Sequence, residues 1–208
     1  MTKREITGNI SDEIIISGKF EKDYYEACNF EKISVPNVKI IDVEYYNCVF
    51  DGAQFVKSLF KSCRFEKCTF KNSDLSLITV SETSFLDTKF VNCKLIGVDW
   101  TKSAKPFNVD FENSKMNDSV FFNMDLRSTK MTECEIQNSD FERANLSKAV
   151  MTKSDLLNTS FSDTNLSFAD LREAVNYRIN PVNNNIRRAK FSLPEAAALL
   201  EQWEIEIE

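Results

Sequence analysis

A large apolar residue recurs at every fifth position along most of this 208-residue chain, and few backbone conformations accommodate such a period. On a helix with 3.6 residues per turn, residues five apart scatter around the cylinder. In a straight strand they alternate between the two faces. The period fits a chain that turns a corner every five residues and keeps its large side chains inside. The series runs from Phe20 to Trp100, slips by one residue, and continues from Phe111 to Leu171.

A second register of compact residues lies two positions before the large ones, as in Cys48 before Phe50 and Ala144 before Leu146. Alternation of large and small inward residues suits interdigitated packing. Residue types also recur at a spacing of 20, so four sides of five residues make one coil. Stacked coils would pair as strands about 4.8 Å apart. The predicted core includes the phenylalanines of these columns: Phe30, Phe50, Phe70, Phe90, Phe111, Phe121, Phe141 and Phe161.

The alternative fold is a β-sandwich, whose hairpins need turn residues every 8–12 positions, usually with Gly or Pro. This chain has only 4 Gly and 4 Pro, and several independent columns agree with a repeat. The sequence therefore predicts an all-β solenoid, a four-sided β-helix of about eight to nine coils.

Composition leaves little for catalysis or ligand binding. The chain has no His, which removes the commonest general base, and it has no glycine-rich phosphate loop. We therefore expect no enzymatic activity, no cofactor and no metal site. The six cysteines lie in the compact inward register, and we interpret them as free core thiols: Cys28, Cys48, Cys63, Cys68, Cys93 and Cys134.

Location follows from the same composition. No apolar run approaches the length of a membrane span, and the first residues lack the apolar segment of a signal peptide. We expect a cytoplasmic protein without membrane contact.

The chain divides into three segments. Residues 1–15 form an N-terminal cap, with Ile14, Ile15 and Ile16 starting the stack as a strand. Residues 16–191 form the β-helix, in which the slip near 101–108 predicts a local bulge and, as an alternative, a small recognition loop. The rhythm weakens after Leu171, because Asn176 and Pro181 fit the inward positions poorly.

Residues 192–208 change the pattern. Ser192 to Glu195 reads as a capping box with proline in the first turn, which predicts an α-helix from Pro194 to about Trp203. Alternating Glu and Ile then predict a short tail strand. This segment caps the last coil, forms a homodimer seam, or does both. The candidate interface residues are Leu193, Leu199, Leu200, Trp203, Ile205 and Ile207.

Several five-residue units resemble the repeat of pentapeptide repeat proteins, and the match covers roughly residues 20–191. The resemblance implies a right-handed quadrilateral β-helix. The tail from Lys190 to Ala196 is similar to that of Qnr-type quinolone-resistance proteins of Gram-positive bacteria. That similarity implies a rod-shaped dimer that imitates DNA and protects DNA gyrase and topoisomerase IV from quinolones. The matching units are Ser73-Asp74-Leu75-Ser76, Ala144-Asn145-Leu146-Ser147 and Ala169-Asp170-Leu171-Arg172-Glu173.

The charges test the idea of DNA imitation, which needs a sustained negative surface. Between Lys19 and Lys190 the outward positions carry 23 acids and 24 bases, so the net charge of −6 comes from the ends of the chain. The face that contains Tyr25 carries five acids and seven bases. Two hypotheses follow: a gyrase-binding protein of the Qnr type, and a scaffold that binds another protein through mixed-charge faces. Neither involves direct contact with nucleic acid.

Overall fold

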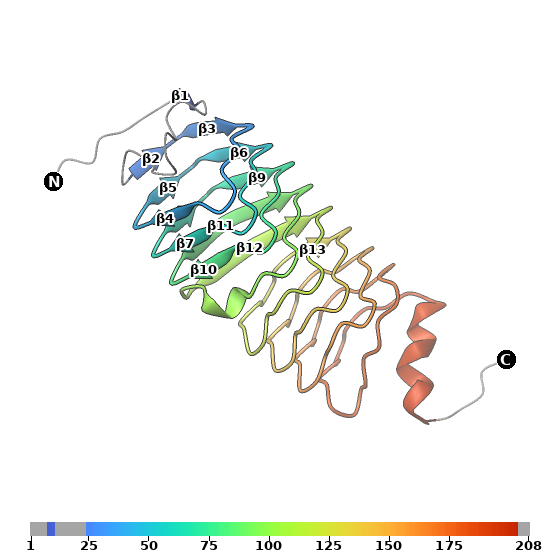
Figure 1. The fold of residues 1–208 in the computed structure, drawn as a ribbon. Helices are drawn as coiled ribbons and strands as arrows, with labels where there is room; N and C mark the ends of the chain where they lie inside the picture. The colour runs from blue at the N-terminus through green and yellow to red at the C-terminus, as the bar shows by residue number, and fades with distance from the viewer. Residues whose placement is uncertain (1–7, 11–23, 204–208) are drawn as a thin grey trace.

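The chain winds into a stack of square coils that ends in a short helix (Figure 1). The computed structural model describes residues 8–10 and 24–203, with side chains for residues 24–200. The strands are short because each side of a coil holds only a few residues before the next corner. They are β1 (Gly8–Ile10), β2 (Tyr24–Glu26), β3 (Cys28–Glu31), β4 (Lys39–Ile41), β5 (Glu44–Tyr46), β6 (Val49–Asp51), β7 (Leu59–Lys61), β8 (Arg64–Glu66), β9 (Thr69–Lys71), β10 (Thr79–Ser81), β11 (Ser84–Val91), β12 (Phe107–Glu112) and β13 (Met131–Thr132).

Nearly every corner contains one residue in the left-handed backbone region, two positions after a large inward residue; the slip, where Lys102 lies in a 3-10 turn, is an exception. Consecutive examples are Asn37, Asp42 and Asn47, followed by Gly52, with φ of 58°, 58°, 52° and 69°. Asn, Asp and Gly tolerate this conformation better than other residues, and nearly half of the non-glycine corner positions are Asn or Asp. The five-residue period is therefore a turn signal as well as a burial signal.

All strand pairs are parallel, and the register between coils is 20 residues on either side of the slip. Phe30 pairs with Phe50 and Phe50 with Phe70, while Tyr45 pairs with Phe65 on the adjoining side. β11 spans two sides, because it turns at Asp87, where φ is 49°. Two sides therefore merge into one 10-stranded sheet, and β4, β7 and β10 form a separate 3-stranded sheet. This arrangement confirms the predicted all-β solenoid.

The interior is filled by stacked aromatic rings, which confirms the predicted core. All eight predicted phenylalanines are at most 5% exposed. Along one column the ring centroids lie 4.5 Å apart for Phe30–Phe50 and for Phe50–Phe70, 5.0 Å for Phe70–Phe90, and 5.3 Å for Phe90–Phe111. Successive coils therefore place like rings in offset contact along the axis.

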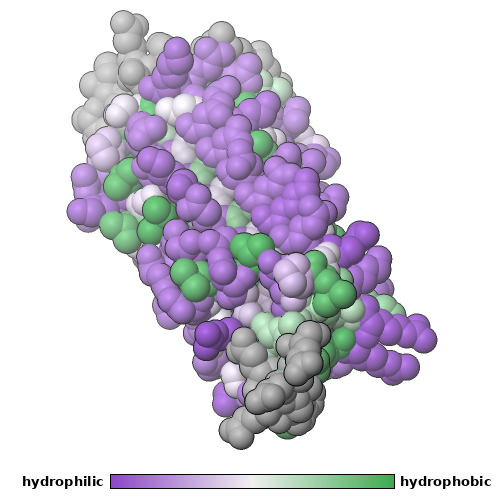
Figure 2. Space-filling view, turned by 90° about the vertical axis from the view of Figure 1, so that its right-hand side faces the viewer, coloured by the Kyte–Doolittle hydropathy of each residue, from purple (hydrophilic) through white to green (hydrophobic). Residues whose placement is uncertain are grey.

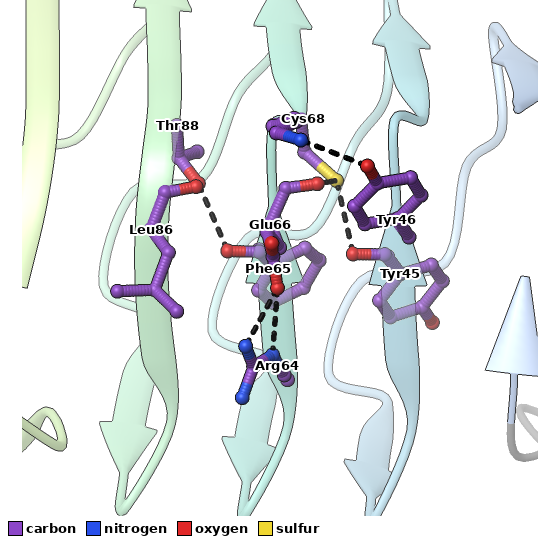
Figure 3. A network of polar contacts seen from close by, with 9 residues as sticks. Tyr45, Tyr46, Arg64, Phe65, Glu66, Cys68, Leu86 and Thr88 are labelled. Atoms are coloured by element: carbon purple, nitrogen blue, oxygen red, sulfur yellow. Dashed lines mark hydrogen bonds and ion pairs between the residues drawn. The ribbon is translucent and has the colours of Figure 1, made fainter. Parts of the chain in front are cut away.

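The compact inward register has a second role, which the sequence reading missed. Its hydroxyls and thiols donate to backbone carbonyls of the preceding coil, as Thr88 Oγ1 does to Phe65 O (3.1 Å) and Cys68 Sγ to Tyr45 O (3.3 Å) (Figure 3). Ser154 both donates to Met131 O (2.8 Å) and accepts from Cys134 N (3.0 Å). These bonds satisfy buried backbone groups near the corners, where the ladder is interrupted.

The predicted one-residue bulge is confirmed. Before it, Asp74 bridges to Lys94, a spacing of 20, and after it Lys94 bridges to Lys115, a spacing of 21. The extra residue is absorbed by the 3-10 helix η3 (Trp100–Lys102), whose first turn is capped by the Asp99 carboxylate. Trp100 remains fully buried, so the insertion displaces chain outward and leaves the core continuous.

The two ends differ from the prediction in detail. β1 pairs with β3 at a spacing of 20, so the ladder reaches Gly8, ahead of the predicted start at residue 16. The predicted strand at Ile14–Ile16 lies outside the described residues. In the last coils, the inward positions near Asn176 and Pro181 are taken by Tyr177 and Ile179, both 2% exposed.

The predicted C-terminal α-helix is a 3-10 helix, η4 (Glu195–Trp203). Its first turn contains the i→i+3 bond from Ala197 N to Pro194 O (3.0 Å). The Ser192 hydroxyl accepts a hydrogen bond from the backbone N–H of Glu173 (3.2 Å), so the side chain that was expected to cap the helix bonds to the last coil. Ser192 therefore anchors the segment to the solenoid.

Candidate functional site

The C-terminal segment places the predicted interface residues in different environments. Leu193 is 83% exposed, whereas Leu199 packs against the core and Leu200 is half-buried. Trp203 ends η4, but its side chain lies outside the described part, as do Ile205 and Ile207 entirely. Among the described candidates, Leu193 is therefore the residue most available to a second molecule.

Groups that could support chemistry are dispersed in the part of the chain that the structure describes. No three His, Cys, Asp or Glu side chains there are arranged to hold a metal. The six predicted core thiols are buried and unbridged. Burial raises the pKa of the Cys63 and Cys93 thiols to about 11, and that of Cys134 to about 12. These thiols are poor nucleophiles, because the thiolate is the reactive form.

No helix within the described ranges is long and apolar enough to cross a membrane. The surface seen in Figure 2 is mostly hydrophilic, with hydrophobic residues scattered between the polar ones. Several large apolar side chains are exposed at corners, and two lie against guanidinium groups: Arg143 over Phe122 at 5.7 Å and Arg188 over Phe168 at 5.6 Å.

An open groove of about 910 Å³ lies beside the displaced chain at the slip. The segment Lys105–Asn108 forms one side, and the next two coils form the other through residues 124–129 and 147–148. Phe107 is half-buried and Met124 is 8% exposed, so the lining includes apolar side chains. The insertion thus creates a surface feature, and the alternative role of a small recognition loop at the slip stays a prediction.

The rim of this groove is basic. Arg127 donates to both carboxylate oxygens of Asp125 at 2.8, 3.1 and 2.7 Å, and this pairing holds the pKa of Asp125 below its usual range. Lys105 and Lys148 also line the groove, and no carboxylate among the described residues forms an ion pair with either. The five-residue period could not reveal this basic rim, because the rim depends on which coils the insertion brings together.

The fold defines the chain as a four-sided parallel β-helix with a filled core. The sequence match agrees with this architecture: the family description "Pentapeptide repeat region" fits residues 38–105 and 63–141, and "Pentapeptide repeats (8 copies)" fits residues 139–175. The chain belongs to the pentapeptide repeat family.

One solved structure extends the likeness of fold. Full-length QnrB1, described as a plasmid-mediated fluoroquinolone resistance protein, superposes with a TM-score of 0.59 at 15% identity. The alignment covers 98% of this chain and 100% of that one. HetL, a pentapeptide repeat protein involved in heterocyst differentiation regulation in the cyanobacterium Nostoc sp. strain PCC 7120, has a TM-score of 0.45 at 11% identity. That alignment covers 79% of this chain and 85% of that one. No curated protein sequence matches the chain. At 15% identity the likeness to QnrB1 is one of fold.

Proposed function

We propose that this chain is a non-enzymatic rod that acts by binding a partner protein through its outer faces. One observation carries the proposal: a single cluster of side chains fills the interior from Tyr25 to Ile179. The remaining chemistry lies on flat faces and corners that repeat along the axis. Extended solenoid surfaces of this kind serve recognition.

The first candidate partner is a type II topoisomerase, DNA gyrase or topoisomerase IV, which the chain would protect from quinolones in the cytoplasm. Support comes from the shared fold with QnrB1 over nearly the whole of both chains, and from the similarity of the tail segment. The test is a supercoiling assay of gyrase and a decatenation assay of topoisomerase IV, each with a fluoroquinolone and increasing protein. We expect activity to recover at low micromolar protein. Unchanged drug sensitivity of both enzymes would overturn this assignment.

A second candidate, a scaffold for a different partner, is favoured by the charge arrangement. Outward acids and bases are balanced over the coils, and many pair locally, as Lys115 does with Glu135 (2.8 Å) and Lys153 with Glu133 (3.1 Å). Such a surface lacks the continuous negative charge of DNA. Failure of the topoisomerase assays, with the folded protein verified by circular dichroism, would favour this role.

We also propose that the C-terminal segment joins two copies into a homodimer. Val182 and Leu193, in the last coil and the tail, are 75% and 83% exposed. Exposed apolar side chains at one end of a rod suit an isologous contact. Light scattering should give twice the chain mass for the parent protein and the single mass for Leu193→Glu. A monomeric parent would remove the proposal, and an unchanged mass for Leu193→Glu would exclude this residue from the seam.

A further inference from the structure

The seven bases and five acids of the face that contains Tyr25 separate along the rod at the slip. Before it the corner carries the carboxylates Glu26, Glu44, Glu66 and Asp87, with Arg64 and Lys67 among them. After it the only acid is Asp125, which Arg127 engages. The nearly balanced total for this face therefore hides a change from net negative charge before the slip to net positive charge after it. The bases that follow the slip, named here the basic corner, are Lys105, Arg127, Lys148, Arg187 and Arg188.

Backbone hydrogen bonds stack the coils of the basic corner directly on one another. Ser128 N donates to Ser147 O (3.0 Å), Lys148 N to Ser167 O (2.9 Å), and Phe168 N to Arg187 O (2.9 Å). The basic side chains therefore follow one edge from the groove to the last coil. From Arg127 to Arg188 that edge spans three coil steps of about 4.8 Å, or roughly 14 Å.

Most of these bases are free to meet a partner's charge. Lys105, Lys148, Arg187 and Arg188 are all exposed. None of the four forms an ion pair with a carboxylate in residues 24–200, although other bases of the rod do. Arg188 is instead held over the exposed ring of Phe168. A row of unneutralised bases on a protein with a net charge of −6 is a local attractor for anions.

We propose that the basic corner and the adjoining groove bind an acidic segment of a partner protein that carries an apolar anchor. The proposal rests on the protein-binding role argued above and specifies the chemistry of the partner. Carboxylates would face Lys148, Arg187 and Arg188, and an apolar side chain would enter the groove beside Phe107 and Met124. The edge matches about four residues of extended chain. Complementary charge would accelerate association and fix the direction of the segment.

A nucleic acid fits this surface less well. Its phosphates would meet the carboxylates on the same corner before the slip, which confines contact to the last few coils. The groove also offers the apolar surface of Pro106, Phe107 and Met124, which a peptide side chain can cover. An acidic peptide therefore satisfies both the charge and the groove.

Fluorescence anisotropy can test the proposal with the full chain and a labelled peptide of Glu and Asp residues around one central Phe. We expect Lys148→Glu/Arg188→Glu to weaken binding about tenfold, and higher ionic strength to weaken it as well. The matched control is Lys57→Glu/Lys61→Glu, since both lysines are exposed on the other sides of the coil and Lys57 has φ of 58° against 62° for Lys148. The control should change binding less than twofold.

Three results would overturn the proposal. The first is an equal loss of peptide affinity in the basic-corner variant and the control variant, and the second is equal affinity for a peptide with Ala in place of the central Phe. The third is tighter binding of single-stranded oligothymidylate that is weakened by the same basic-corner variant. The last would assign the corner to nucleic acid. The measurement contains no topoisomerase, so its failure is distinguishable from failure of the drug-protection assays.

Discussion

Gly97 lies so close to Leu77 of the preceding coil that a Cβ at Gly97 would come within 2.7 Å of Leu77 Cδ2. Both residues occupy left-handed corner positions, with φ of 70° and 59°. At the equivalent corner of Gly52, a Cβ would lie 3.3 Å from Lys32 Cγ, which belongs to a flexible side chain. Leu77 Cδ2 is also the end of a side chain, which is 48% exposed, so a Cβ at Gly97 would displace this methyl group by rotating the Leu77 side chain.

Gly97→Ala should therefore lower the free energy of unfolding by about 1–2 kcal/mol, since the Leu77 side chain must also shift, and Gly52→Ala by about 1 kcal/mol, measured by urea denaturation. Adding Leu77→Ala should recover part of the loss in the first variant, because it removes the clashing atom. Additive effects in this double-mutant cycle would contradict the contact.

Ser154 tests the polar role of the compact register. Ser154→Ala removes a fully buried hydroxyl that bonds to both Met131 O and Cys134 N, so it should cost about 1–3 kcal/mol in urea denaturation. Ser167→Ala is the control, since that serine is half-buried at a corner. Equal effects of the two changes would mean that the compact residues act only through their size.

The sequence alone predicted the coil, its four sides and its core, because burial repeats strictly enough to be read from spacing. Phe50 and Phe141 had to face inward once the corner was placed every five residues. The left-handed corner residues, such as Asn47 and Asp42, carried a readable signal in their type that a search for apolar residues overlooks. What the period cannot give is the hydrogen bonding of Thr88 or Ser154, which depends on the exact offset of neighbouring coils.

The candidate surface was less predictable for a related reason. The slip was visible, but the groove arises where Lys105 faces Lys148 across two coils, and a one-dimensional period contains no such distance. The C-terminal segment was predicted to be an α-helix and is the 3-10 helix η4, and Ser192, predicted to cap it, bonds instead to Glu173 in the last coil. Long-range contacts decide these features, and local patterns do not report them.

Phe70 lies in the middle of the aromatic column, between Phe50 at 4.5 Å and Phe90 at 5.0 Å. Phe70→Ala should lower the free energy of unfolding by about 3–5 kcal/mol, since it leaves a cavity and breaks two ring contacts. Phe70→Leu should recover more than half of that loss by refilling volume. Denaturation midpoints that match between Phe70→Ala and the parent protein would contradict a close-packed axis.

Ala144 and Lys148 test the inward register with the same substitution. Ala144 is 1% exposed, so Ala144→Asp buries a charge and should lower the melting temperature by about 10 °C or prevent folding. Lys148 is exposed with φ of 62°, a conformation that Asp tolerates. Lys148→Asp should therefore change the melting temperature by about 2 °C at most. Thermal melts with equal shifts would mean that the two positions do not differ in burial.

The buried thiols predict a loss of stability at alkaline pH. Burial raises the pKa of Cys134 from an ordinary value of 9.0 to about 12, so above pH 9 the unfolded chain releases a proton that the folded chain retains. The contribution of this thiol to the free energy of unfolding is therefore complete below pH 9. It declines as the pH rises toward 12, by about 1.4 kcal/mol per pH unit.

Cys134→Ser isolates this effect, because Ser114 and Ser154 occupy the neighbouring coils of the same column. Urea denaturation of both proteins across the alkaline range should show the parent losing stability relative to the variant once the pH exceeds 9, with a constant difference at lower pH. Ellman's reagent should leave the native thiols unmodified at pH 8 and react once urea unfolds the chain. Parallel pH curves, or rapid modification of the native protein, would place the thiol in contact with water, and the compact register would then not be sealed at this coil.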